Sequence, residues 1–196
     1  MNNLLLGTGA IAGIVIGIVA FLLLLFAIWY ISAYNKLINK RNVLEEAWAT
    51  IDVYLKKRYD LIPNLVNTVK GYASHEKETF QKVTEARAMA MSATTPAEKV
   101  EADRAFTNVL RSFNRVTENY PQLKANTNFM DLQNQLRTIE NELAQARKYY
   151  NATSRDFNTK IQSFPSNIVA KKMKLEKQPY FELDSEEEKK NVTVSF

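Results

Sequence analysis

The chain has 196 residues, with 26 Lys and Arg against 21 Asp and Glu and no cysteine. The lack of cysteine excludes disulfides and a lipoprotein anchor, and a net charge of +5 is too weak to indicate nucleic acid. The 165 residues after Ile31 suffice for one domain with its own core.

The first element is an apolar run. From Ala10 to Ile31 no side chain is charged, and at about 1.5 Å per residue the run spans the roughly 30 Å of a bilayer core. We predict a transmembrane helix at about residues 10–31, within an N-terminal segment 1–34. A cleaved signal peptide is the alternative, but it requires a basic start and a shorter apolar core.

The flanks of this run predict its orientation. Lys36, Lys40 and Arg41 follow the run, whereas the residues before it include no Lys or Arg. Because positive charge is retained on the cytoplasmic side, we predict a single pass through the cytoplasmic (inner) membrane with the N-terminus outside. Trp29 and Tyr30 then lie at the inner headgroup level, where aromatic residues are enriched.

Glycine is concentrated at the start of the run. Gly9, Gly13 and Gly17 form two overlapping G-x-x-x-G motifs on one helix face. Such a face lets two helix backbones approach closely, so it predicts helix–helix contact in the membrane and a homo-oligomer. The alternative is that glycine is simply frequent in membrane helices.

After the anchor, apolar residues recur at helical 3-4 spacing. The first series is Leu37, Leu44, Trp48, Ile51, Leu55, Ile62, Leu65 and Val69. Pro63 interrupts it, so a kink or a break is expected there. The pattern predicts an all-α fold, in which a single N-terminal transmembrane helix is followed by an elongated antiparallel bundle of three to four long helices over residues 35–165.

Two further helices have start signals. Thr95 is predicted to be an N-cap, with Pro96 in the first position and Glu98 completing a capping box. Asn128 is expected to cap the last long helix, which Pro165 ends. The apolar face of that helix is predicted at Phe129, Leu132, Leu136, Ile139, Leu143, Ala146, Tyr150, Thr153, Phe157, Ile161 and Phe164.

The tail, residues 166–196, is basic and then acidic. SNIVAKKMKLEK is expected to form a short basic helix. The final NVTVSF alternates like a strand, and a lone strand is either disordered or paired with a neighbouring subunit.

Residues for enzyme chemistry are scarce. His75 is the single histidine, and Thr79 stands where an H-E-x-x-H motif needs its second histidine. Di-iron and zinc sites in bundles need more His, Cys or paired Glu-x-x-His ligands than this chain has. We therefore predict a non-enzymatic protein with no catalytic, metal or cofactor site, and a surface position for His75.

Arg58 is the polar exception in the first apolar series. An unpaired charge in a core costs several kcal/mol, so Arg58 is expected to pair with a carboxylate from another helix, such as Glu118 or Glu140. The alternative is that the series drifts at Pro63 and leaves Arg58 exposed.

Two short basic clusters have the chemistry to bind an anionic lipid or a nucleic acid. They are Lys56-Lys57-Arg58 and Lys171-Lys172-Lys174. Neither is interleaved with exposed aromatic residues, so an ordinary solvated face is favoured and no nucleic acid is expected.

The stretches RYDLIPNLV, YPQLKAN and ARKYYN, with the sequence around them, resemble the LemA family of bacterial membrane proteins over roughly residues 34–170. The resemblance implies one membrane helix, a cytoplasmic helical bundle and no established catalytic activity. It also suggests work beside a membrane metalloprotease of the HtpX type, in membrane-protein quality control.

The resemblance carries over residues only as structural or partner-surface positions. They are Arg58, Asp60, Asn64, Tyr120, Pro121, Tyr150 and Asn151. The tail after Lys171 lies largely outside the resemblance. The function expected from sequence is a membrane-anchored scaffold or adaptor that self-associates, with lipid or nucleic-acid binding by the lysine clusters as the alternative.

Overall fold

The computed structural model describes residues 2–181, with side chains from residue 11 onward. It divides into two compact units. The first unit is Met1–Leu44 with Arg155–Gln178, and the second is Glu45–Ser154 with the chain from Pro179. The expected strand at NVTVSF lies outside the described residues. The boundaries predicted after residues 34 and 165 stay predictions.

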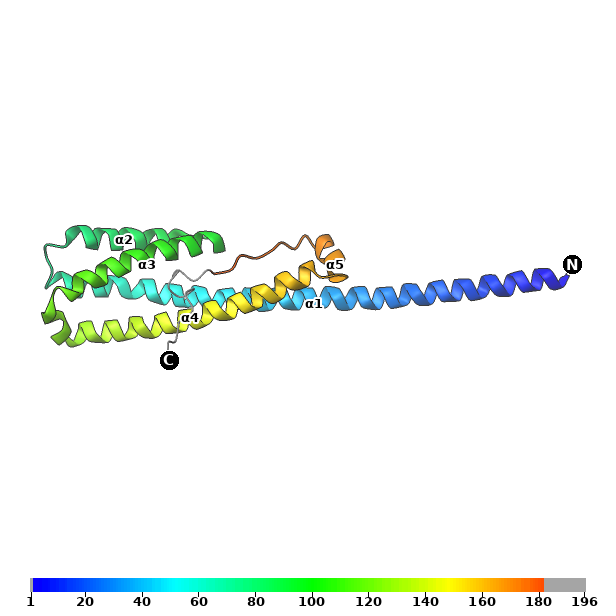
Figure 1. Ribbon diagram of the computed structural model, residues 1–196, viewed down its shortest axis with the longest axis horizontal. Coiled ribbons are helices and arrows are strands. Elements are labelled where there is room, and N and C mark those ends of the chain that lie inside the picture. The colour runs from blue at the N-terminus through cyan, green and yellow to red at the C-terminus, as the bar shows by residue number, and fades with distance from the viewer. Residues whose placement is uncertain (1, 182–196) are drawn as a thin grey trace, which may run out of the picture. The chain divides into compact units, whose positions relative to one another are not determined.

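The described residues form helices and connecting segments (Figure 1). The helices are α1 (Asn2–Lys70), α2 (Lys77–Ser92), α3 (Pro96–Glu118), the short 3-10 helix η1 (Pro121–Ala125), α4 (Thr127–Gln162) and α5 (Ser166–Lys172). The all-α fold with a long apolar N-terminal helix is thus confirmed. The basic helix predicted after Pro165 is α5.

In the second unit, the order of contacts gives the helix directions. Along α1, contacts with α2 and α4 come in reverse sequence order, whereas contacts with α3 come in the same order. With α2, Tyr59 contacts Arg87 and Lys70 contacts Phe80. With α4, Trp48 contacts Tyr150 and Arg58 contacts Glu140. With α3, Asp52 contacts Lys99 and Arg58 contacts Asp103. Successive helices therefore run antiparallel, which confirms the predicted bundle.

Pro63 does not break α1, which continues to Lys70. A proline has no N–H for the carbonyl four residues earlier, here that of Tyr59. Arg87 of α2 supplies the missing donor, because its Nε donates a hydrogen bond to the Tyr59 carbonyl at 2.7 Å. Pro63 itself is exposed, so its ring does not disturb the core. Of the two alternatives at Pro63, a kink or a break, the break is therefore wrong, and the contact with Arg87 supplies the donor that the proline lacks.

The helix starts are partly as predicted. Thr95 caps α3, its side chain accepting from the Glu98 N–H while the Glu98 carboxylate accepts from the Thr95 N–H, as a capping box requires. The cap of α4 is Asn126 rather than Asn128, since Asn126 Oδ1 accepts from the Phe129 N–H at 2.9 Å. Asn126 is extended after η1, whereas residue 128 is already helical.

The first unit packs the end of α4 and α5 against α1. Its buried apolar residues are Ala33, Leu37, Leu44, Phe157, Ile161, Val169 and Ala170. Lys40 and Asp156 form an exposed ion pair at 3.1 Å across it. Phe164, predicted as the last core residue of the α4 series, is instead 81% exposed. It lies beyond the end of α4 at Gln162, where the helical register no longer directs it inward.

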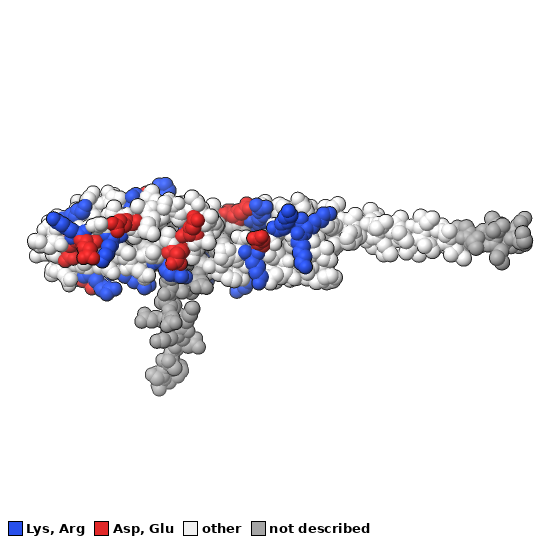
Figure 2. Space-filling model, turned by 90° about the horizontal axis from the view of Figure 1, so that it is seen from above, with Lys and Arg blue, Asp and Glu red and all other residues white. Residues whose placement is uncertain are grey.

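Residues 11–28 of α1 are all exposed, and most are large and apolar. Figure 2 shows no charged side chain on the described part of this stretch. Among the described residues, α1 is the one helix long and apolar enough to cross a membrane. An ideal Cβ built on Gly13 or Gly17 meets nothing within 4 Å, so this glycine face is open. The side chains of residues 2–10, and so the surroundings of Gly9, lie outside the described set.

Candidate functional site

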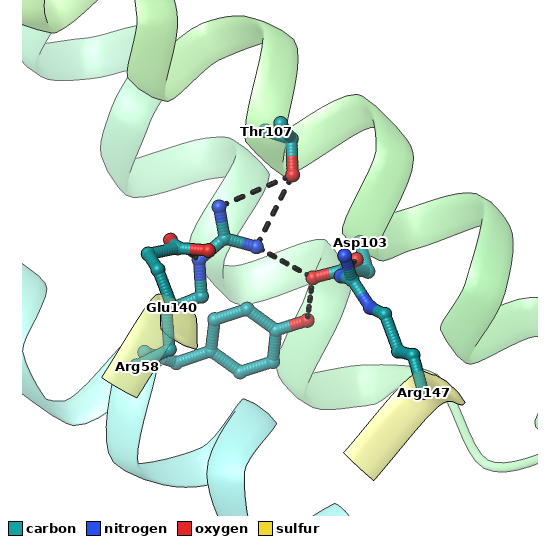
Figure 3. A network of polar contacts seen from close by, with 6 residues as sticks. Arg58, Asp103, Thr107, Glu140 and Arg147 are labelled. Carbon is teal, nitrogen blue, oxygen red and sulfur yellow. Dashed lines mark hydrogen bonds and ion pairs between the residues drawn. The ribbon is translucent and has the colours of Figure 1, made fainter. Parts of the chain in front are cut away.

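Arg58 lies at the centre of a buried ionic network in the second unit (Figure 3). Its side chain is 2% exposed, and Nη1 donates to Asp103 Oδ1 at 2.7 Å. Its Nε lies 2.6 Å from Glu140 Oε1, an ion pair without hydrogen-bond geometry. Thr107 Oγ1 accepts from both terminal nitrogens at 3.1 Å. The predicted partner Glu140 is confirmed, and the alternative of an exposed Arg58 is wrong.

Asp103 joins a second arginine to this network. Its carboxylate is 1% exposed and also pairs with Arg147 of α4. Two arginines thus face Asp103 and Glu140, so the network is formally neutral. Tyr59 donates to Asp103 Oδ1 at 3.5 Å, and its burial, together with that negative charge, raises its pKa well above the usual value. The cluster holds three helices in one register and shows no group poised as a nucleophile or base.

The second feature of this unit is a segment-binding surface, formed by Trp48, Arg147, Tyr150, Asn151 and Ser154. It holds the extended residues 179–181 by their backbone. Asn151 donates to the Phe181 carbonyl at 2.8 Å and accepts from the Phe181 N–H at 2.7 Å. The hydroxyls of Tyr150 and Ser154 donate to the Pro179 carbonyl at 3.1 and 3.3 Å.

Aromatic packing completes this surface. Phe181 is 3% exposed and stacks on Trp48, with ring centroids 6.1 Å apart. The guanidinium carbon of Arg147 lies over the Phe181 ring, 4.7 Å from its centroid. Trp48 also meets Tyr150 edge to face at 5.3 Å. Burial raises the pKa of the Tyr150 hydroxyl above its usual value.

The surface therefore contacts the main chain of the segment and one aromatic side chain. A side-chain amide that gives one bond and takes one reproduces the pairing of a β-ladder, which does not depend on the sequence of the bound segment. The neighbouring Tyr180 is 48% exposed and contributes little to recognition. Arg147 contacts both Asp103 and Phe181, so the ionic network and the segment share one residue.

The other carried-over residues lie apart from this surface. Asp60 pairs with Lys56 at 2.6 Å and lies 3.8 Å from Arg87. Asn64 is exposed. Tyr120 donates to Glu76 at 3.4 Å, and burial and that carboxylate raise its pKa.

Sequence reasoning missed Asp103, Arg147 and Phe181. Asp103 had a detectable signal, because it lies three residues before Phe106 on the apolar face of α3 and is a carboxylate at a core position. Phe181 had none, since it belongs to no periodic series.

The structure also shows the surroundings of the candidate metal ligands and of the two basic clusters. Among the described residues, no three His, Cys, Asp or Glu side chains are grouped to hold a metal ion. His75 is exposed, as predicted. The cluster at residues 56–58 is divided, since Arg58 is buried while Lys56 pairs with Asp60. Lys171 and Lys172 remain exposed on α5.

Residues 47–196 match the LemA family, a match that includes the tail we expected to lie largely outside the resemblance. Over 155 residues the chain is 27% identical to Protein LemA of Metamycoplasma hominis, covering 77% of this chain and 69% of that protein. This chain belongs to the LemA family.

Proposed function

We propose that this chain is a membrane-anchored adaptor without enzymatic activity, which self-associates and holds an extended segment of a partner at the cytoplasmic face of the inner membrane. A place in membrane-protein quality control, beside a membrane metalloprotease, fits such a role. The anchor is the exposed apolar part of α1. The observation that carries the proposal is the segment-binding surface, where α1 and α4 hold a segment by its backbone and by one aromatic side chain.

In this chain the surface is occupied by residues 179–181 of the same molecule. Ser154 and Tyr150 are buried, and each hydroxyl would lose its hydrogen bond to the Pro179 carbonyl if the segment left without a replacement. Exchange for another extended segment with an aromatic residue is therefore favoured over an empty surface. Tethering in one plane raises the local concentration of such segments and offsets the advantage of the covalently attached one.

The test is a peptide-binding measurement on the full chain in mild detergent. The probe is a capped, fluorescently labelled peptide EKQPYF, the sequence of residues 176–181. Phe181→Ala empties the aromatic pocket, so this variant is expected to bind the probe, whereas the wild type binds it weakly. A control peptide EKQPYA should bind at least about tenfold more weakly, because it lacks the buried ring.

Two further variants keep the test decisive. Phe181→Leu retains an apolar side chain for the case in which Phe181→Ala unfolds, as judged by circular dichroism. Asn151→Ala combined with Phe181→Leu removes the backbone pairing and should abolish probe binding. A folded Phe181→Leu protein that binds neither peptide would contradict the proposal.

The basic residues of α5 favour a second candidate, binding of anionic lipid. Lys171 and Lys172 are exposed, and Lys172 Nζ lies 5.6 Å from the ring centre of Tyr30. This candidate predicts association with anionic vesicles that weakens with salt and with neutralisation of Lys171, Lys172 and Lys174.

A further inference from the structure

The turn between α4 and α5 exposes large apolar side chains in the first unit. Phe164 is 81% and Ile168 is 54% exposed. The opposite side of α5 is packed, with Ser166, Val169 and Ala170 buried. The exposed side chains of α5 and of the turn before it are thus apolar as well as basic. We call Phe164, Ile168, Lys171 and Lys172 the outer face of α5.

The helix α5 lies beside the end of the uncovered part of α1 (Figure 1). Side chains from residue 11 to residue 28 are exposed, and Trp29 and Tyr30 are the first to be partly covered. Lys172 lies over the Tyr30 ring at 5.6 Å, which places the C-terminal end of the outer face at the level of Tyr30. An aromatic pair at the end of an apolar helix marks the headgroup level of a membrane.

The charges of the outer face are all positive. Lys171 and Lys172 form the last turn of α5, which contains no acidic residue. Figure 2 shows Lys and Arg side chains gathered where the uncharged part of α1 ends. Positive charge beside exposed apolar side chains is the composition of interfacial helices, whose apolar residues enter the headgroup–acyl boundary while lysines meet lipid phosphates.

We propose that the outer face of α5 is a second membrane contact, in which Phe164 and Ile168 insert into the cytoplasmic leaflet and Lys171 and Lys172 bind anionic headgroups. This inference rests on the proposed anchoring of α1 and deepens it. A bilayer is the occupant that the observations favour, because the face continues the apolar surface of α1 and its charge complements anionic lipid. The contact restricts the tilt of the first unit relative to the membrane.

The experiment uses the full chain in vesicles containing anionic lipid. The chain has no cysteine, so Phe164→Cys carries a single environment-sensitive fluorophore at the outer face. Met130→Cys, an exposed apolar position near the start of α4, is the matched control. At residue 164 we expect a blue-shifted emission that lipid-borne nitroxides quench and aqueous iodide does not. At residue 130 we expect the reverse.

A second measurement avoids a label at the insertion point. Acylation of lysine amines, read by mass spectrometry, should be slow at Lys171 and Lys172 in anionic vesicles. The Phe164→Ser, Ile168→Ser double variant removes the apolar insertion. In this variant, the ratio of molecules with α5 bound to the membrane to molecules with α5 in water should fall by at least about tenfold. Faster acylation at Lys171 and Lys172 then reports the loss, while the exposed Lys124 serves as the internal control.

Each other outcome overturns the proposal. Quenching of residue 164 by iodide alone places it in water. Protection from both quenchers means that protein covers the face, either a second copy or another partner. Unchanged acylation in the double variant means that Phe164 and Ile168 do not hold the lysines at the membrane. Flotation of the chain with vesicles is scored separately, so that failed anchoring of α1 is distinguished from failure of this second contact.

Discussion

The two parts of α1 share one helical backbone but differ in which side chains they bury. Residues 11–28 expose every side chain and carry no charge, whereas from Leu37 to Val69 an apolar stripe is buried and most exposed residues are charged or polar. The first part has no polar face, a composition that suits surroundings that are apolar on all sides. The second part has direction, and that direction allows one arginine to be buried with its partners.

The buried part is expected to give the largest effect. Asp103→Ala leaves Arg58 and Arg147 without their shared carboxylate, and we expect the free energy of unfolding to fall by about 3–5 kcal/mol. Chemical denaturation of the full chain in detergent measures this loss. Lys82→Ala removes an exposed pair with Glu78 and is the matched control, expected to leave the midpoint nearly unchanged. Equal effects of the two substitutions would contradict the assigned role of the network.

A smaller effect is expected at the proline of α1. Arg87→Ala leaves the Tyr59 carbonyl without a donor and should cost about 1–3 kcal/mol. In a Pro63→Ala background the restored N–H serves that carbonyl, so the same substitution should cost less. The coupling energy from a double-mutant cycle measures the difference. Additive losses would mean that Arg87 acts only through Asp60.

The exposed part is tested through its glycine face. A Cβ added at Gly13 or Gly17 meets nothing within 4 Å, so Gly13→Ile with Gly17→Ile should leave folding unaffected. If the face joins two helices, dissociation of the assembly in detergent should increase about tenfold or more. Light scattering coupled to size exclusion reads the mass, and Ile14→Leu with Ile18→Leu is the control. An unchanged mass would refute contact through this face.

The smallest effect is a pH dependence at the start of α3. Backbone hydrogen bonds from Thr95 and Thr94 lower the pKa of Glu98 from 4.5 to about 2. A carboxyl whose pKa is lowered by folding stabilises the folded state above pH 4.5, and that contribution is lost as pH falls towards 2. The stability advantage of the wild type over Glu98→Gln should therefore be present at pH 6 and absent by about pH 2. A pH-independent difference in melting temperature would contradict this assignment.

Sequence periodicity predicted the helices, whose apolar residues repeat, but it missed the residue at which α4 ends. The helices, the capping box at Thr95 and the pairing of Arg58 with Glu140 all follow from spacing and charge. Phe164 was misplaced because the register of α4 stops at Gln162, and no pattern marks that stop except Pro165. The segment-binding surface contains Trp48 and Tyr150, and the segment that it holds contains Phe181. These residues are far apart in sequence, so only the folded chain brings them together.

The hydrogen bond from Arg87 to Tyr59 has a consequence for synthesis. The apolar part of α1 and the turn around Pro63 are translated before α2 exists, and Arg87 follows Pro63 by 24 positions. At about 5–20 residues per second, the ribosome adds those positions in on the order of 1–5 s. During that interval the Tyr59 carbonyl relies on water, so the proline turn of the nascent helix is completed only when the α2 hairpin arrives.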